Sequence, residues 1–211
     1  MEIKPLSSQE LEVLYTSSLA RDFPPEERMP LKRMLALTRL GHQQTLGLFD
    51  GTSLAAYAVL ILNQASRPAA LLNYFAVEPG CRGQGVGGQA LELLRRAAAR
   101  LDLPYILFEV EAPESALNSQ ELETRQRRVR FYLRGGARPT EVDSWLYGVD
   151  YHIMLLPAQG QNPAPTSALV KAQLEALYLT ALTETPEPGL SLGDVSRVFL
   201  PKGDAEGYYS P

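Results

Sequence analysis

The sequence is poor in the residues that build disulfides and metal centres. It contains a single cysteine, Cys81, which excludes an internal disulfide and any metal site made from several cysteines. Its two histidines, His42 and His152, stand far apart in the chain without companion ligands, so no metal site is expected. With 211 residues, the chain is long enough for one well-packed core and an appendage.

The sequence also lacks an excess of positive charge and long apolar runs. The net charge of −4 at pH 7 argues against nucleic acid as a partner of the fold as a whole. No run approaches ~18 apolar residues, so no membrane span is expected. The first stretch, MEIKPLSSQELEVLY, has no basic segment followed by an apolar one. We therefore expect no signal peptide and a cytoplasmic location.

Helical and strand-like patterns alternate in a definite order along the chain. A capping box at Ser7 or Ser8 with Glu10 begins the first expected helix. Two apolar runs flank Asp50-Gly51, which predicts a hairpin. We expect helices over about residues 8–21, 31–41, 88–100, 121–134 and 166–182, and strands within 44–62, 70–77, 104–111 and 137–157.

This order predicts an α+β fold with a mixed, mostly antiparallel central sheet flanked by helices. The sheet and its helices are expected within residues 1–156, and residues 157–211 are expected to form a linker and a C-terminal helical extension. An apolar stripe in the extension, which includes Leu174, Leu177 and Tyr178, is expected to pack on the chain's own core or on a second subunit of a homodimer.

A glycine-rich stretch, VEPGCRGQGVGGQALELLRRAAARL, stands before the third helix. It holds Arg82 and the glycines at positions 80, 83, 85, 87 and 88. The free N–H groups and the dipole of a helix N-terminus attract anions, and glycine lets the chain approach a ligand closely. The stretch therefore predicts a phosphate-binding loop, in which Arg82 neutralises charge or fixes the loop.

Two other kinds of phosphate loop can be weighed against the sequence. A P-loop is excluded because residues 87–89 read Gly-Gly-Gln where Gly-Lys-Ser/Thr is required. A Rossmann loop is formally matched by Gly83, Gly85 and the glycine at 88, with Glu109 as the later acidic residue. However, residues 78–82 separate this loop from its strand, and a hairpin lies upstream. A Rossmann-type dinucleotide-binding oxidoreductase remains an alternative.

The segment from Arg82 to Gly87 has the form Gln/Arg-x-x-Gly-x-Gly/Ala, and FAVEPGCRGQGVGGQAL resembles the acetyl-CoA loop of the GNAT N-acetyltransferases. The segment RFYLRGGA, residues 130–137, resembles the family's Phe-Tyr-x-x-x-Gly-Phe motif. The resemblance implies a GNAT-like fold over about residues 1–156. It also implies transfer of an acetyl group from acetyl-CoA to a primary amine of a small-molecule or peptide acceptor, by direct attack in a ternary complex. A non-catalytic CoA-binding module is a second alternative.

The same resemblance implies roles for individual residues. The backbone amides of the loop would hold the pyrophosphate of acetyl-CoA, and the preceding strand would pair with its pantetheine. The expected cofactor-binding residues are Phe75, Ala76, Val77, Arg82, Gly83, Gln84, Gly85, Val86 and Gly87. Tyr132 would be the general acid that protonates the leaving thiolate.

Two groups of carboxylates are candidates for contact with the acceptor. Glu109 and Glu111 alternate with apolar residues, so both are expected on one face of their strand. Either could take the proton of the amine directly or through water, and each could instead pair with the nearby arginines. A water chain could also replace a side-chain base. Glu26 and Glu27 lie in a proline-rich break, and loops at this place often line the acceptor site in the family, so the resemblance implies that a cationic amine could meet them. They could instead simply cap the next helix.

Overall fold

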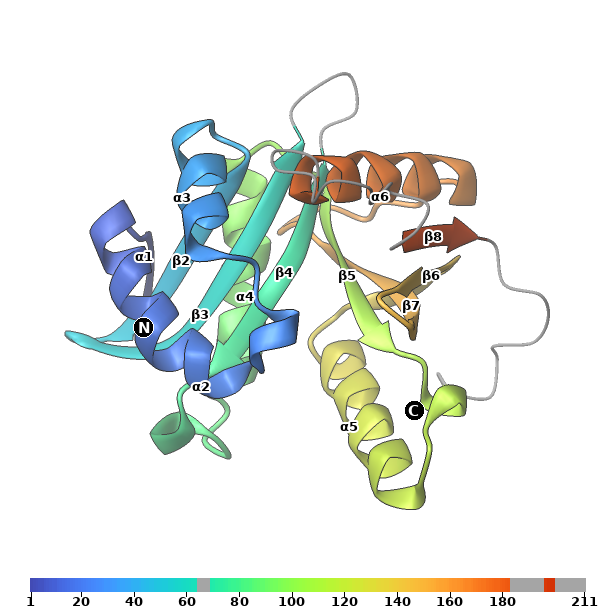
Figure 1. The fold of residues 1–211 in the computed structure, drawn as a ribbon, viewed down its shortest axis with the longest axis horizontal. Helices are drawn as coiled ribbons and strands as arrows, with labels where there is room; N and C mark the ends of the chain where they lie inside the picture. Colours follow the sequence, from blue (N-terminus) through green and yellow to red (C-terminus); the bar gives the residue numbers. More distant parts are fainter. Residues whose placement is uncertain (64–68, 183–195, 200–211) are drawn as a thin grey trace.

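The computed structural model describes residues 1–63, 69–182 and 196–199 (Figure 1). These residues form an eight-stranded sheet with the strand order β1-β2-β3-β4-β5-β7-β6-β8. The strands are β1 (Glu2–Pro5), β2 (Gln43–Asp50), β3 (Ser53–Asn63), β4 (Ala69–Val77), β5 (Tyr105–Glu111), β6 (Arg138–Leu146), β7 (Val149–Pro157) and β8 (Ser196–Phe199). The mixed, mostly antiparallel sheet predicted from the sequence is confirmed, because β4 and β5 are the one parallel pair among the described strands.

Helices cover both faces of this sheet. The α-helices are α1 (Ser8–Leu14), α2 (Ala20–Asp22), α3 (Leu31–Arg39), α4 (Val86–Arg100), α5 (Ser119–Arg134) and α6 (Ser167–Leu182). Four short turns are η1 (Tyr15–Leu19, a π-helix), η2 (Pro25–Glu27), η3 (Pro79–Cys81) and η4 (Pro113–Ser115). None of the helices in the described ranges is long and apolar enough to cross a membrane.

The first helix contains an irregularity that the periodicity did not predict. It begins at the expected capping box, in which Ser7 and Glu10 bond to each other's backbone N–H groups. After α1 it widens into the π-turn η1 and resumes as α2 up to Asp22. A π-turn inserts one extra residue into a helix and changes which side chains face the neighbouring structure. Strands β1 and β8 were also not predicted from the sequence.

The apolar core has two layers, one on each face of the sheet. On one face, α4 and α5 pack against β3, β4, β5 and β7 through residues such as Leu91, Leu94 and Phe108. On the other face, α1 and α3 cover one half of the sheet. Helix α6 covers the second half, with Leu174 and Leu177 fully buried against β3, β4 and β5 (Figure 1). The C-terminal helix thus packs on this chain's own sheet.

The parallel strands β4 and β5 separate soon after they meet. Their pairing consists of Leu71 opposite Leu107, after which the two strands diverge (Figure 1). In the antiparallel pairing of β3 with β4, the register moves from Tyr74 to Leu72, so Asn73 is an extra residue in β4. Such a bulge bends its strand. The bend leaves the edge of β4 that faces β5 without a strand partner among the described residues beyond Leu71.

The topology also decides against one alternative. A Rossmann domain needs successive parallel βαβ units. Here β2, β3 and β4 form an antiparallel meander, and β5 is followed across the sheet by antiparallel β7. The dinucleotide-binding oxidoreductase is therefore wrong, even though the glycine spacing matches.

Candidate active site

A cavity of about 890 Å³ lies where β4 ends, between the N-terminus of α4 and helix α5. Its walls come from β4 (Phe75, Ala76, Val77), from the glycine loop and α4 (Cys81, Arg82, Gly83, Gly85, Val86, Gly87, Gly88, Glu92, Arg95) and from α5 and its C-terminal end (Arg128, Phe131, Tyr132, Arg134, Gly135, Gly136). Of the residues expected to bind the cofactor, only Gln84 does not line it. The Gln84 side chain instead donates to the carbonyl of Gly80 at 2.9 Å.

The glycine loop presents bare backbone donors at this cavity. Gly83 and Gly85 have φ values of 75° and 77°, a conformation that side chains other than that of glycine rarely adopt. Gly85 caps α4 without any side-chain acceptor. The N–H groups of residues 83–88 donate to no acceptor among the described residues. A helix N-terminus with several free donors favours a bound anion.

Close packing of α4 and α5 also depends on glycine. A Cβ atom on Gly87 would lie 2.9 Å from the ring of Phe131, and one on Gly135 would lie 2.2 Å from Cδ1 of Leu91. Both distances are shorter than the closest approach that a Cβ atom normally makes to another carbon atom. The two glycines therefore let the helices approach each other at the wall of the cavity.

Arg82 fixes the loop through contacts within the protein. Its Nε donates to the carbonyl of Val77 at 2.9 Å, and its Nη2 donates to Oδ1 of Asp22 at 3.0 Å. Asp22 is at the end of α2, and its other oxygen accepts from the hydroxyl of Tyr57 at 3.1 Å. Of the two expected roles of Arg82, these contacts match the one that fixes the loop.

A second link from the same helix reaches the residue before the loop. The carboxylate of Glu78 accepts hydrogen bonds from Ser18 Oγ and from Arg21 Nη1, the latter at 2.8 Å. Sequence reasoning missed Ser18, Arg21 and Asp22, because nothing in a local pattern joins residues that lie about 60 positions apart.

Tyr132 of α5 lines the cavity. Its ring packs against Phe108 with centroids 4.4 Å apart and against Phe131 at 5.1 Å. The residue is 9% exposed, and its hydroxyl bonds to no other residue in the described part of the chain. Burial raises the pKa of Tyr132 to about 12, with a small opposing effect of Arg128. The phenol therefore keeps its proton at neutral pH and can donate it.

Glu109 lies on the opposite face of β5 from Tyr132. Its neighbour Phe108 packs against Tyr132 on the α5 face, whereas the Glu109 carboxylate accepts a hydrogen bond from Tyr178 of α6. Burial raises the pKa of Glu109 to about 6, although the Tyr178 hydrogen bond opposes this rise. A carboxylate with a pKa close to neutrality is suited to act as a general base.

Glu111 has different surroundings. Its carboxylate pairs with Arg128 and with Arg125, whose Nη2 is 3.6 Å away, and both arginines come from α5. Arg125 also donates to the carbonyl of Ala112 at 2.8 Å and so fixes the chain that follows β5. The expected alternative of pairing with arginines therefore describes Glu111, whereas Glu109 pairs with none in the described ranges.

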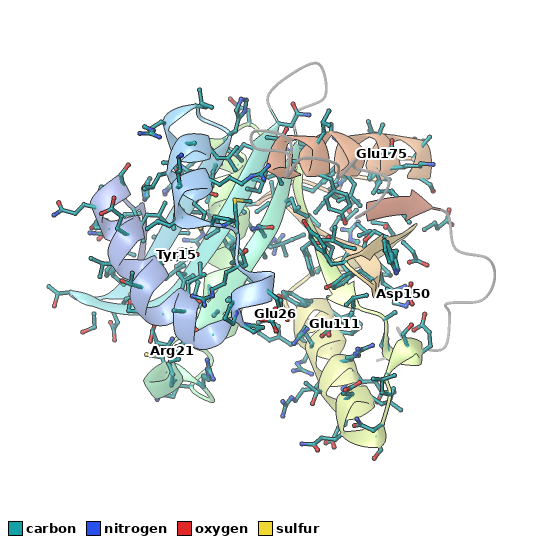
Figure 2. All side chains as sticks on the ribbon, viewed as in Figure 1. Tyr15, Arg21, Glu26, Glu111, Asp150 and Glu175 are labelled. Atoms are coloured by element: carbon teal, nitrogen blue, oxygen red, sulfur yellow. The ribbon has the colours of Figure 1, made fainter. Side chains whose placement is uncertain are left out.

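The proline-rich break lies close to these carboxylates. The Tyr74 hydroxyl accepts from the N–H of Met29 at 2.7 Å and donates to the carbonyl of Glu27 at 2.8 Å, so β4 holds the break in place. Burial raises the pKa of Glu27, and the charges of Glu111 and Glu26 add to the rise. Figure 2 shows Glu26 and Glu111 on neighbouring parts of this face. The carboxylates of Glu26, Glu27 and Glu111 therefore lie close enough to influence one another, and Arg128 offsets part of their charge.

The fold agrees with solved structures of low sequence identity. A GNAT-family protein from Bacteroides thetaiotaomicron superposes with a TM-score of 0.65 at 20% identity, over 85% of this chain and 97% of that one. Spermidine N-acetyltransferase from Vibrio cholerae, solved with CoA and spermine, gives 0.55 at 13% identity, over 74% and 95%. The ribosomal-protein-S18-alanine N-acetyltransferase from Escherichia coli gives 0.53 at 21% identity, over 78% and 99%.

Sequence comparison identifies the family more directly. No curated protein matches the chain significantly. The sequence model of the Acetyltransferase (GNAT) family matches residues 11–122, which include the divergent strands β4 and β5 and the glycine loop between them. With that match over more than half of its length, the chain belongs to the GNAT family of acetyltransferases and is an acyltransferase.

Proposed function

We propose that the protein transfers an acetyl group from acetyl-CoA to a primary amine by direct attack within a ternary complex. The observation that carries this proposal is a single cavity lined both by loop residues with free backbone donors, Gly83 and residues 85–88, and by Tyr132. Donors of this kind suit a pyrophosphate. A phenol suits the sulfur of a thioester, which leaves as a thiolate and needs a proton.

The proposed cofactor-binding residues fit the parts of acetyl-CoA in order along the cavity. The loop amides would bind the pyrophosphate, while Arg82 holds the loop in shape through Val77 and Asp22. The free edge of β4, at Phe75 and Ala76, would pair with the amides of the pantetheine. The thioester would then lie where β4 and β5 diverge, within reach of Tyr132.

The proposed reaction needs one acid and one base. The amine nitrogen attacks the carbonyl carbon of the thioester, the C–N bond forms, and the C–S bond breaks. Tyr132 supplies the proton that converts the leaving thiolate to the thiol, and Glu109 takes the proton that the amine nitrogen loses. The two side chains lie on opposite faces of β5. Tyr132 can therefore donate to the sulfur on one side of the carbonyl carbon while Glu109 accepts from the nitrogen on the other.

The acceptor side supports an amine that carries positive charge. Glu27, Glu109 and Glu111 lie on that side, and their charges act on Tyr151 of β7, whose pKa is raised to about 12 by burial and by these carboxylates. An ammonium group is attracted to such a surface, and it releases one proton to solvent before it attacks as the neutral amine, whose second proton Glu109 takes. Both the small-molecule and the peptide amine remain candidates.

The test combines binding and turnover. Binding of acetyl-CoA and of NADH is measured by isothermal titration calorimetry, and only acetyl-CoA is expected to bind. Release of CoA thiol from acetyl-CoA is then measured with a panel of polyamines, amino acids and peptides with free N-termini. Amine-dependent thiol release supports the proposal. Binding of acetyl-CoA with no turnover on any amine would favour the non-catalytic CoA-binding module.

A further inference from the structure

Helix α6 places buried hydrogen-bonding side chains, among them that of Tyr178, in a mostly apolar interface. Tyr178 is 2% exposed and packs with Leu174, Leu177 and Val142. Its hydroxyl donates to the carboxylate of Glu109 on β5. Because the single proton of the phenol is used there, the hydroxyl of Ser144 on β6, 3.0 Å away, donates to the phenol oxygen in turn.

No other residue in the described ranges holds the Glu109 carboxylate. It forms no ion pair there, and Tyr178 is its hydrogen-bond donor. The titratable groups that face it are Tyr178 from α6, Tyr151 from β7 and, on its own strand, Glu111. None of these is a cation. The donated hydrogen bond is therefore the main interaction that favours the ionised form against burial.

We propose that Tyr178 is a positioning residue: through its hydroxyl, helix α6 holds the Glu109 carboxylate ionised and oriented, so that it can accept the proton of the incoming amine. This inference rests on the proposed function, in which Glu109 is the base. Helix α6 lies beyond residues 11–122, where the family model matches. The C-terminal extension would thus complete the acceptor side of the site.

The interface offers a matched control for this hydrogen bond. One turn or more away along α6, Gln173 accepts a hydrogen bond from the hydroxyl of Tyr105 at 2.6 Å. Tyr105 is also on β5 and is 3% exposed. Tyr105→Phe removes a buried hydrogen bond between the same two elements, but it does not touch Glu109. It therefore reports any general loosening of α6.

The first measurement is a titration of the glutamate carboxyl carbons by ¹³C NMR in the full chain. The Glu109 signal is assigned by its loss in Glu109→Gln. In Tyr178→Phe, the Glu109 titration is expected to move upward by about one pH unit or more, because a hydrogen bond to the charged form is lost. Tyr105→Phe is expected to leave it in place. If Tyr178→Phe folds poorly, Ser144→Ala is used in its place. It removes the hydrogen bond from Ser144 to the phenol oxygen of Tyr178 and is expected to raise the pKa of Glu109 by a smaller amount.

The second measurement is the pH dependence of kcat/KM with the amine that gives the fastest turnover in the panel. In Tyr178→Phe, the fall of kcat/KM on the acidic side of the profile is expected to move to higher pH by the same amount as the NMR titration. In Tyr105→Phe it is expected to stay where it is in the wild type. The inference would be overturned if, in Tyr178→Phe, both the Glu109 titration and the acidic side of the kcat/KM profile were the same as in the wild type. If Glu109→Gln then still abolished the fall of kcat/KM at low pH, the proposed function would stand without a role for Tyr178. If Glu109→Gln retains full turnover and the fall of kcat/KM at low pH, the choice of base is wrong and the inference falls with it.

Discussion

The carboxylate of Asp22 accepts a hydrogen bond from Nη2 of Arg82 at 3.0 Å, and this contact ties the end of the first helix to the glycine loop. The Asp22 side chain is 8% exposed, whereas that of Arg82 is 56% exposed. The buried partner therefore sets the position of the exposed one. Because Arg82 also binds the Val77 carbonyl, the contact fixes both ends of the turn that precedes α4.

Asp22→Asn is expected to weaken the binding of CoA about tenfold. The asparagine keeps the size of the side chain but weakens the charge-assisted hydrogen bonds from Arg82 and from Arg21, so the loop amides are no longer held in one arrangement. The measurement is the Kd of CoA by calorimetry. Tyr57→Phe is the matched control, because it removes another hydrogen bond to Asp22 and leaves Arg82 bound. Equal losses in both variants would contradict the special role of the Arg82 contact.

Tyr132→Phe is expected to lower kcat by about a hundredfold or more, the usual loss when a general acid is removed. The phenylalanine keeps the contact with Phe108 at 4.4 Å between centroids, so folding and CoA affinity should change little. Initial rates of thiol release at saturating substrate concentrations give kcat, and calorimetry gives the Kd of CoA. A variant that binds and turns over like the wild type would remove Tyr132 from the mechanism.

Gly85→Ala is expected to lower the melting temperature and to weaken CoA binding, since Gly85 has a φ of 77° and an alanine there costs about 1–2 kcal/mol. The strain is released by distortion of the loop. Gly80→Ala serves as the comparison, because a Cβ atom at Gly80 meets nothing within 4 Å and its φ is ordinary. Thermal unfolding and calorimetry of both variants check this, and a Gly85→Ala protein equal to Gly80→Ala would refute it.

His152 is expected to make stability depend on pH. Burial lowers the pKa of His152, but the hydrogen bond and charge of Asp143 and the charge of Glu114 outweigh burial and raise it. The distances from the ring nitrogens are 2.8 Å to Asp143 and 2.9 Å to Glu114. With a raised pKa, the stabilisation is complete below the unfolded value of about 6.5 and is lost as the pH rises through the folded value.

His152→Asn should therefore reduce the free energy of unfolding more at about pH 6 than at about pH 9. Urea unfolding at several pH values measures both curves. His42→Asn is the control, because His42 lies exposed in the turn after α3 and has no side-chain hydrogen bond among the described residues. A difference between wild type and His152→Asn that stays constant with pH would show that the imidazolium has no such effect.

Local patterns predicted those elements whose signals lie within a few residues. The capping box at Ser7, the hairpin at Asp50-Gly51 and the glycine loop are of this kind, and each is where the sequence placed it. Strand β1 has four residues and exposes three of them, so it carries no alternation to detect. The residues of the π-turn η1 have the composition of an ordinary α-helix, and the turn differs from an α-helix only in its backbone hydrogen bonds.

The candidate site could be predicted in its parts but not in its connections. The alternation of Glu109 and Glu111 predicted a shared face, yet one carboxylate bonds to Tyr178 and the other pairs with Arg125 and Arg128. Tyr178 lies 69 positions after Glu109, and no periodicity links them. Contacts between distant segments depend on how helices dock on the sheet, which local patterns do not specify.

Beyond the Leu71–Leu107 pair β4 and β5 diverge, and Tyr132 and Glu109 lie on opposite faces of β5. In the proposed reaction the two substrates would therefore approach from opposite faces, the thioester from the side of Tyr132 and the amine from the side of Glu109. Neither has to leave before the other arrives. Initial-rate plots with both concentrations varied should therefore intersect, and desulfo-CoA should compete with acetyl-CoA without competing with the amine.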